Sequence, residues 1–252
     1  MIKLSSIIIA KNEEKNIGRC IKSQLGCVDE IVVVVDEKSS DRTAEIVQTF
    51  PEVKHSVSKW QGYSGTKNFA LQLTTNDWVL WIDADEALTP ELKNELQQFK
   101  YSQPVFNVYS IPRIANFLGR WIKHSGWYPG RVARLFNQTK VRFSESDVHE
   151  HLVHSGVTGE LLNDIEHYTD PSIFHYFEKY NRYTSLAAEE IHKKKKRFRL
   201  TDLLIRPCFL FIKMFFIKRG FLDGIQGFIL AVFSAAYVFT KYAKLWEIEK
   251  DE

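Results

Sequence analysis

The 252-residue chain is poor in cysteine, and its three cysteines form no recognisable pattern. Cys20, Cys27 and Cys208 include no C-x-x-C pair and no metal-ligand spacing, which argues against a disulfide framework and suits reduced thiols in a reducing compartment. The N-terminal stretch "MIKLSSIIIAKNEEKN" is too short in its apolar run for a signal-peptide core and lacks a small-residue cleavage site. We therefore expect a cytosolic N-terminus that begins with a strand.

The chain also lacks internal repeats and a strong net charge. A formal charge of only +3 gives no overall field that would favour nucleic acid. The one basic block, "HKKKKRFR" at residues 192–199, has only Phe198 for base stacking, so it argues against a nucleic-acid partner. An anionic membrane surface is the partner that such a lysine run attracts.

With 44% hydrophobic and 26% charged residues, the composition is that of a globular protein with one large domain and an appendage. The first hundred residues alternate strand-like segments that are apolar on both faces with helix-like segments. We expect strands at 4–10, 30–36, 54–57 and 78–83, and helices at 13–25, 39–50, 63–73 and 89–99. This alternation predicts an α/β fold with a parallel sheet covered on both sides, an architecture typical of nucleotide binding.

From about residue 105 the pattern changes. A strand at 105–113 precedes a stretch rich in Trp, Gly, Pro and Arg, which is typical of long loops and an antiparallel extension. A helix is expected from about 171 to 197.

The last fifty residues contain two strongly apolar segments separated at "KRG". Both show a narrow polar stripe at helical spacing, formed by Asp202, Arg206 and Lys213 in the first and by Asp223, Gln226, Ser234, Tyr237, Lys241 and Lys244 in the second. The longest uncharged run, 224–240, falls short of the ~20 residues that span a bilayer. We expect two interfacial helices on a membrane surface. Helices buried in the protein or in a dimer interface, and a true membrane span, stay open as alternatives.

Three carboxylates follow a buried strand in "DWVLWIDADEALTP" at residues 77–90. A D-x-D pair such as Asp83 and Asp85, placed beyond a strand end, can hold Mg²⁺ or Mn²⁺ through oxygen ligands, and that cation can bridge a diphosphate. The alternative is a solvated turn, with Glu86, that leads into the N-terminus of the next helix, where acidic residues are favoured.

Three motifs in order, "SIIIAKNEEKNIGRCIKS", "EIVVVVDEKSSDRTAEI" and "WIDADE", resemble the inverting nucleotide-sugar glycosyltransferases of family 2. "QGYSGTKN", "GWYPGRVARLF", "DVHEHL" and the C-terminal tail are similar to β-glucosyltransferases that extend the inner core of bacterial lipopolysaccharide or lipooligosaccharide. Glu37 and Lys38 depart from this pattern, because the broader family has Asp and Gly there. The resemblance implies a GT-A fold with a Rossmann-like mixed sheet in residues 1–199 and a membrane-associating helical extension in residues 200–252.

The same resemblance implies a nucleotide-sugar site. Asp36 would accept a hydrogen bond from uracil, Asp83 would contact the ribose or diphosphate, and Asp85 would ligate the metal. The remaining residues that it assigns to the donor are Ala10, Lys11, Asn12, Glu14, Lys67, Asn68 and Ala84. A plain surface lysine is the alternative for Lys67, and a structural hydrogen-bonding role is the alternative for Asn68.

Inversion needs a carboxylate that deprotonates the attacking hydroxyl. The best candidate is Glu150 in "SESDVHEHLVH", followed by Asp147 and then Glu145. The resemblance assigns His149 to the metal or to a phosphate, with an ordinary hydrogen-bonding role as the alternative. The zinc motif H-E-x-x-H is absent here, because position 153 is Val153.

Aromatic and basic side chains in "GWYPGRVARLF" suit a sugar acceptor that carries anions. We expect Trp127, Tyr128, Arg131 and Arg134 to contact it, with core packing as the alternative for the two aromatic residues. The expected protein is a metal-dependent inverting transferase that moves glucose from UDP-glucose to an inner-core heptose of a lipid-anchored acceptor. It would be peripheral on the cytoplasmic face of the bacterial inner membrane. A polyprenyl phosphate acceptor and a non-enzymatic adaptor are the alternatives.

Overall fold

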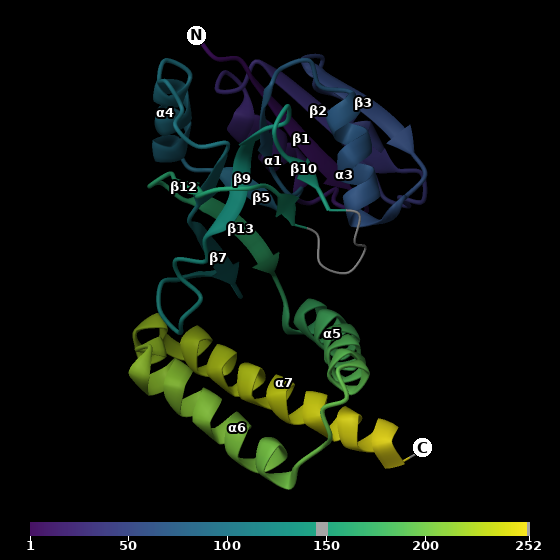
Figure 1. Cartoon of the computed structure of the whole chain (residues 1–252), viewed down its shortest axis with the longest axis vertical. Coiled ribbons are helices and arrows are strands. Elements are labelled where there is room, and N and C mark those ends of the chain that lie inside the picture. The colour runs from purple at the N-terminus through teal and green to yellow at the C-terminus, as the bar shows by residue number, and fades with distance from the viewer. Residues whose placement is uncertain (145–150, 251–252) are drawn as a thin grey trace. The chain divides into compact units, whose positions relative to one another are not determined.

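The computed structural model describes residues 1–144 and 151–250. The chain forms two compact units, and each is described by itself: Met1–Arg113 with Gly130–His167, and Ile114–Pro129 with Tyr168–Glu252. Figure 1 traces the elements along the chain by colour. Two strands, β7 (Arg113–Phe117) and β13 (Ile165–Asp170), begin in the first unit and end in the second.

A seven-stranded sheet in the order β12-β6-β9-β4-β1-β2-β3 forms the centre of the first unit. Its strands are β1 (Leu4–Ala10), β2 (Glu30–Asp36), β3 (Val53–Ser58), β4 (Trp78–Trp81), β6 (Val108–Ile111), β9 (Val132–Asn137) and β12 (Gly159–Glu160). Strands β1 to β4 are parallel, and β9 is antiparallel to both β4 and β6. The strand order reverses between β1 and β4, which is where open α/β sheets bind ligands beyond the carboxyl ends of the strands.

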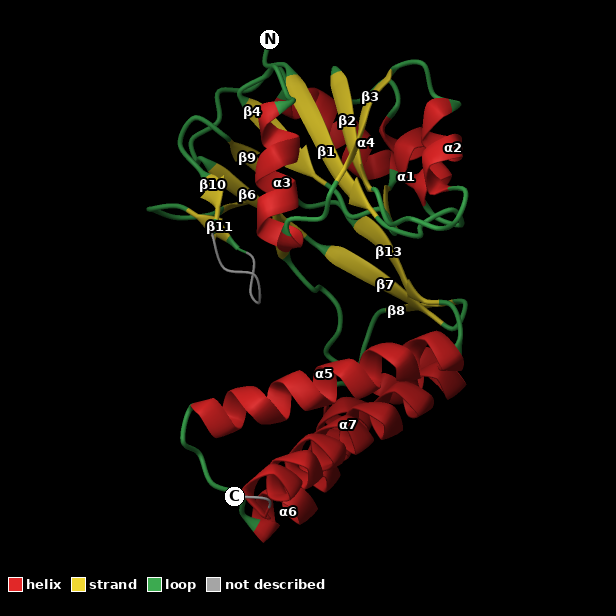
Figure 2. Cartoon of the chain, turned by 90° about the vertical axis from the view of Figure 1, so that its right-hand side faces the viewer, coloured by secondary structure: helices red, strands yellow, loops and turns green. Residues whose placement is uncertain are grey.

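The central strands are buried on both faces because helices or a hairpin cover each side (Figure 2). One face packs on α1 (Ile17–Gln24), α2 (Thr43–Gln48) and α4 (Pro90–Phe99). The other face packs on α3 (Gly62–Gln72) and on the strand pair β10 (Arg142–Phe143) and β11 (Leu152–Val153). Alternate residues of one strand therefore enter different cores: Ile8 joins the first and Ile7 the second.

A short strand, β5 (Glu86–Leu88), separates the D-x-D segment from α4. It pairs antiparallel with the start of β13, so that Glu86 stands opposite His167. The N-cap of α4 is Thr89, whose side chain accepts a hydrogen bond from the Leu92 amide, and Pro90 begins the helix. Asp83 and Asp85 thus lie just before β5 and Glu86 is its first residue, so none of the three acidic residues belongs to the first turn of α4.

The second unit is mainly helical. It contains the hairpin of β7 with β8 (Arg120–Ile122), then α5 (Ile173–Lys193), α6 (Leu200–Ile212), the π turn Lys213–Ile217, the 3₁₀ turn Gly220–Asp223 and α7 (Gly224–Lys250). A core around Phe117, Met214 and Leu230 joins the hairpin to α6 and α7. Near the far end of α7, Tyr242 and Leu245 pack on Ala188 of α5. The division of the chain therefore differs from the expected one at residue 199, because 114–129 and α5 pack with the C-terminal helices.

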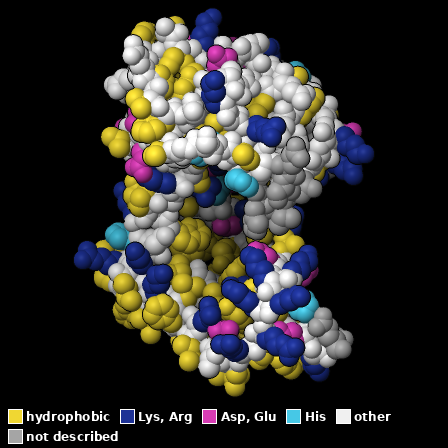
Figure 3. All heavy atoms as spheres, in the orientation of Figure 1, with side chains coloured by type: hydrophobic (Ala, Val, Ile, Leu, Met, Phe, Trp, Pro, Cys, Tyr) yellow, Lys and Arg dark blue, Asp and Glu magenta, His cyan; other side chains and the backbone are white. Residues whose placement is uncertain are grey.

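Two residues of the polar stripe of α7, Tyr237 and Lys244, contact α5, whereas Lys241 lies over the Tyr242 ring. Lys244 Nζ donates to Thr184 Oγ1 and Ser185 Oγ at 2.9 and 2.8 Å, and Tyr180 shares a 2.6 Å hydrogen bond with Thr240. Large apolar side chains are left exposed, and Figure 3 shows them gathered over α6 and the turn that follows it. They include Leu204, Ile205, Phe209, Ile212, Phe216, Ile217, Phe221, Leu222, Ile225 and Phe228.

One helical stretch of the described chain, Gly220–Lys250, is long and apolar enough to cross a membrane, judged by length and composition alone. Only 22% of its most apolar 18-residue window is buried within the protein, with a mean hydropathy of 1.6. Most of this apolar window is therefore not covered by the protein itself.

Candidate active site

The carboxyl ends of β1 and β2 lie side by side and bring Lys11 to Asp36. Lys11 Nζ is 2.7 Å from Asp36 Oδ2, and the Lys38 amide donates to Asp36 Oδ1 at 3.0 Å. The Lys11 ammonium and then the Lys38 amide hold the pKa of Asp36 below its usual value. Asp36 is therefore an ionised acceptor at the crevice where the resemblance assigns the base.

The segment after β1 interlocks with the turn after β2. Asn12 takes a left-handed conformation with φ 56°, and its side-chain oxygen accepts from the Ser40 amide at 2.8 Å. The Glu14 amide donates to Asp41 Oδ2 at 2.9 Å, and Glu14 Oε2 accepts from the Arg42 amide at 3.2 Å. Glu37 and Lys38, where the sequence departs from the family pattern, thus belong to a turn that these contacts hold in place.

Asp83 lies beyond β4 and contacts two cations. Arg134 Nη2 is 2.5 Å from its Oδ2, and Lys67 Nζ is 3.9 Å from its Oδ1. Burial alone would raise the pKa of Asp83, but the charges of Arg134 and Lys67 outweigh it and hold that pKa well below the usual range. Asp83 is consequently ionised at any physiological pH, with its charge balanced inside the protein.

Glu86 is fully buried and shares Arg134 with Asp83. Arg134 Nη2 lies 2.7 Å from Glu86 Oε1, Arg113 Nη1 lies 3.4 Å from the same oxygen, and Glu86 Oε2 accepts from the Asp83 amide at 3.0 Å. Glu86 therefore fixes the backbone of the D-x-D turn. A role limited to favouring the following helix does not fit this position.

Lys67 does not match the surface lysine that was its alternative reading, because only 1% of its side chain is exposed. Its Nζ lies 3.4 Å from the centroid of the Trp81 ring, and the Arg134 guanidinium carbon lies 4.0 Å from it. Trp81 Nε1 also donates to Asp83 Oδ1 at 3.1 Å. Burying a lysine costs free energy, and here the ring and a carboxylate offset that cost. The next residue, Asn68, is half-buried.

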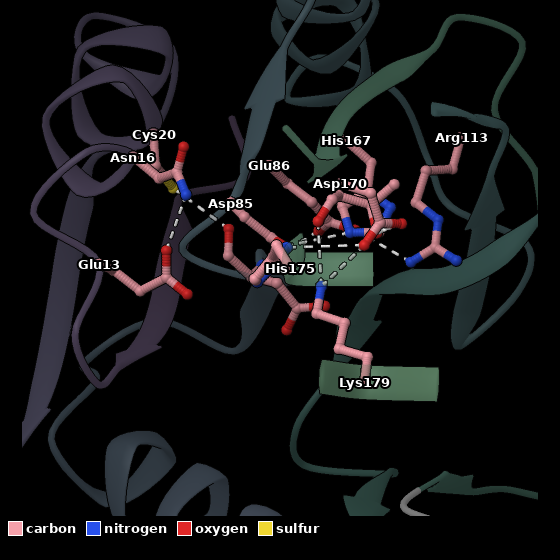
Figure 4. Close-up of polar contacts among 12 residues, drawn as sticks. Glu13, Asn16, Cys20, Asp85, Glu86, Arg113, His167, Asp170, His175 and Lys179 are labelled. Carbon is pink, nitrogen blue, oxygen red and sulfur yellow. Dashed lines mark hydrogen bonds and ion pairs between the residues drawn. The ribbon is translucent and has the colours of Figure 1, made fainter. Parts of the chain in front are cut away.

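Asp85 faces a histidine that sequence analysis did not single out. His167 Nε2 of β13 is 3.2 Å from Asp85 Oδ2, and both side chains are about one-fifth exposed or less (Figure 4). A carboxylate and an imidazole at one opening are a donor set that suits Mn²⁺ and, through the carboxylate, Mg²⁺. The two residues therefore fit the divalent cation that the D-x-D pattern predicts. Within the described residues no larger cluster of His, Cys, Asp and Glu is suited to a metal.

The thiol of Cys20 lies beneath this turn. Its Sγ is 3.5 Å from the Asp83 carbonyl oxygen, and the side chain is fully buried. Burial and the nearby acids Glu86 and Asp85 raise its pKa well above the ordinary value. Cys20 is a packing residue, since a nucleophile would need the opposite shift.

The predicted base and its alternatives, Glu150, Asp147 and Glu145, lie outside the described residues, as does His149. The structure does describe both flanks of this segment. Phe143 of β10 packs edge-on against Trp81 with 5.0 Å between ring centroids, and the Ser144 amide donates to the His151 carbonyl at 2.9 Å. Phe143 and Leu152, which flank this segment, therefore belong to the same apolar cluster as Trp81 of β4, the strand that precedes the D-x-D.

The four residues that were expected to contact the acceptor lie in different parts of the structure. Arg134 is buried against Asp83 and Glu86, which differs from the expected contact with an acceptor. Arg131 binds the Leu161 carbonyl at 3.0 Å and lies 3.3 Å from Glu160. Trp127 and Tyr128 belong to the second unit, where Trp127 packs edge-on against Phe117 and both residues line a cavity.

Comparison with known proteins adds a family to this geometry. Residues 5–159 match the family described as glycosyl transferase family 2. An uncharacterized glycosyltransferase of Rickettsia typhi is 36% identical over 98% of this chain and 88% of its own length. The lipopolysaccharide core biosynthesis glycosyltransferase LpsC of Rhizobium meliloti is 30% identical over 98% of this chain and 93% of its own. A solved structure of S. aureus TarS with UDP-GlcNAc is 16% identical with a TM-score of 0.48, a likeness too low to bear on the donor.

Proposed function

The chain belongs to glycosyl transferase family 2, and we propose that it transfers glucose from UDP-glucose, with inversion, to an inner-core heptose of lipopolysaccharide or lipooligosaccharide. The observation that carries this proposal is the assembly at the ends of β1, β2 and β4. Asp36 and Asp83 are ionised there, Lys67 and Arg134 stand behind Asp83, and Asp85 faces His167. These are the groups that a nucleoside diphosphate with a divalent cation needs.

In this proposal Asp36 accepts from the uracil ring, and Ala10 to Glu14 line the base and ribose. Asp83 orients toward the ribose or the diphosphate from a turn that Glu86 and Arg134 hold rigid. Asp85 and His167 would hold Mg²⁺ or Mn²⁺, which as a Lewis acid supplies stabilisation of the leaving diphosphate. His149 remains a predicted further ligand that lies outside the described residues.

The transfer itself breaks one bond and forms another. The acceptor hydroxyl oxygen attacks the anomeric carbon from the face opposite the diphosphate, and the anomeric C–O bond breaks with its electron pair going to UDP. Glu150 takes the hydroxyl proton, because Asp83 and Asp85 are already engaged by cations or by the imidazole. Lys67 and Asn68 lie on α3 on the donor side, where a fixed positive charge favours the departing phosphate.

The second unit supports a membrane-bound acceptor. Its apolar side chains point outward along α6 and α7, and the basic run at 192–199 would add attraction to anionic lipid. We therefore propose a peripheral protein on the cytoplasmic face of the inner membrane. Similarity to LpsC supports an acceptor in the lipopolysaccharide core.

A panel of UDP-sugars offered with a truncated core acceptor tests this function. We expect transfer from UDP-glucose, release of one UDP per bond, a β-linked product and dependence on Mg²⁺ or Mn²⁺. A product with retained configuration, or full activity in chelator, would overturn the inverting, metal-dependent mechanism.

A polyprenyl phosphate acceptor is the second candidate, since the apolar surface of the second unit suits it equally well. Its phosphate is already ionised and needs little base catalysis. Glu150→Gln should then barely change the rate, whereas transfer to a sugar hydroxyl should fall several hundredfold.

A further inference from the structure

A cavity of about 400 Å³ lies within the second unit, between the loop 123–128 and the C-terminal part of α6 with the π turn. Among the residues that line it are Lys123, His124, Ser125, Tyr128, Lys213 and Lys218. The transfer reaction proposed above assigns no role to its three lysines.

The loop wall of this cavity is fastened by one buried carboxylate. Asp223 accepts from the amides of Lys123 and His124 at 3.2 and 2.9 Å, and its Oδ1 is 3.0 Å from His124 Nδ1. The Ser125 amide donates to the Lys218 carbonyl at 3.0 Å. A Cβ on Gly220 would lie 2.6 Å from Ser125 Oγ, so only glycine lets the loop approach this closely. The wall is therefore built in place before any ligand arrives.

The opposite wall gains its charge from the π turn. The Lys218 amide donates to the Lys213 carbonyl at 2.8 Å, an i to i+5 bond that adds one residue to the turn. Both lysines thereby line the same cavity instead of following the α-helical spacing. Single π turns of this kind are frequent at functional sites.

The positive charge of the cavity is not neutralised within the described part of the chain. No carboxylate there pairs with the ammonium group of Lys123, Lys213 or Lys218, and the nearest acid, Asp223, is already occupied by three N–H groups. Ser125 Oγ is buried and has no hydrogen-bond partner among the described residues. Three ammonium groups, each partly open to solvent, and a hydroxyl without a partner among the described residues line this cavity and offer donors to an anion with several acceptor oxygens.

We infer that this cavity binds a phosphate group carried by a component of the membrane. Phosphate offers three or more strong acceptor oxygens, and lysine binds it as a point charge. The same turns that carry the lysines expose Ile212, Phe216 and Ile217, so a ligand with an apolar anchor beside its phosphate matches both surfaces. The membrane source of the phosphate rests on the proposed membrane association, whereas the anion site itself does not.

Vesicle binding by the full chain tests the site without any sugar donor. Phosphatidylcholine vesicles would carry phosphatidic acid or phosphatidylglycerol, with matched surface charge. We expect the wild type to prefer the phosphate monoester, and Lys213→Gln with Lys218→Gln to lose about tenfold in affinity per lysine together with that preference. The matched control is Lys195→Gln with Lys196→Gln, which should weaken binding to both vesicles equally.

A second arm distinguishes a phospholipid headgroup from a phosphate on the saccharide acceptor. Glycolipid acceptor is presented in neutral phosphatidylcholine vesicles, either intact or treated with phosphatase. If the acceptor carries the phosphate, the double variant should raise KM for the intact acceptor only. If a headgroup is the ligand, the effect should appear in the first arm and be absent here.

The proposal is overturned if the double variant, with an unchanged melting temperature, matches the wild type in both arms. It is also overturned if the wild type follows surface charge alone and ignores acceptor phosphates. Because the first arm needs no transfer, its result stands even if the donor or acceptor proposed above proves wrong.

Discussion

The two units of this chain place polar and apolar side chains in opposite ways. In the first unit apolar residues fill both sides of the sheet, and buried charges such as Glu86, Arg134 and Lys67 gather at the ends of the strands. In the second unit hydroxyl groups and Lys244 join α5 to α7, while large apolar side chains face outward. The contrast teaches that the first unit buries its apolar side chains and keeps its buried charges where we propose that the donor binds, whereas the second unit exposes apolar side chains of the kind that a partner or a membrane would cover.

The largest effect should follow from removing the one D-x-D carboxylate that no arginine or lysine neutralises among the described residues. Asp85→Ala should reduce transfer about a thousandfold and abolish divalent-cation binding, with little change in the melting temperature, because the Asp85 side chain is partly exposed and its ion-pair partner among the described residues is His167. Isothermal titration with Mn²⁺ and initial rates measure both. The matched control is Asp77→Ala, at the other end of β4, where the side chain is exposed. Full activity of Asp85→Ala would contradict the proposal that the charged residues of the first unit form the metal and donor site.

Arg134→Met tests whether the buried charges of the first unit depend on being paired. It leaves Asp83 and Glu86 without their shared cation, so we expect a loss of about 3–5 kcal/mol in the free energy of unfolding. Urea denaturation provides the measurement. Arg131→Met, which removes a contact to the exposed Glu160 and a hydrogen bond to the Leu161 carbonyl, should cost only about 1 kcal/mol. Equal costs for the two variants would contradict the proposed network.

The outward apolar surface gives the next largest effect. Phe216→Ser with Ile217→Ser should leave unfolding within about 0.5 kcal/mol but weaken vesicle binding roughly tenfold or more per residue, since each side chain is more than half exposed. The same change inside the first unit, Phe136→Ser, should cost about 3–5 kcal/mol of stability. Flotation with vesicles and chemical denaturation separate the two outcomes. A large loss of stability in the double serine variant would mean that the surface is internal.

The smallest effect concerns the basic run. Lys195→Gln with Lys196→Gln should weaken binding to anionic vesicles about fivefold per lysine, at about 1 kcal/mol for each, and the effect should fade in high salt. Neutral vesicles are the control. A decrease that persists at high salt would assign these lysines a direct contact in place of long-range attraction.

The sequence predicted the architecture of the first unit well, because strands such as 4–10 and 30–36 are apolar on both faces and the D-x-D follows the expected strand. It could not predict His167 beside Asp85, since the two are 82 residues apart and meet only through the pairing of β5 with β13. The sequence left a surface lysine open as the alternative for Lys67 for the same reason: the burial of Lys67 depends on Trp81 and Arg134 from other elements.

In the second unit, periodicity predicted a polar stripe on α7, and of its members Tyr237 and Lys244 contact α5, whereas Asp223 lies in the turn before the helix. Helix α5 was assigned to the catalytic domain, so the expected boundary at residue 199 separated two helices that pack together. Helical periodicity identifies which face of a helix is polar. It does not identify which other helix packs against that face.

The indole of Trp81 offers an optical consequence. Its ring has an ammonium group and a guanidinium group within about 4 Å, and its N–H is bonded to the carboxylate of Asp83. Indole emission shifts in wavelength and intensity when nearby charges change. A nucleotide or a divalent cation arriving at this edge should therefore change the intrinsic fluorescence of the unlabelled protein, and Trp81→Phe should remove that signal while the other five tryptophans remain. Donor affinities could then be measured by titrating the intrinsic tryptophan fluorescence, without any transfer of sugar.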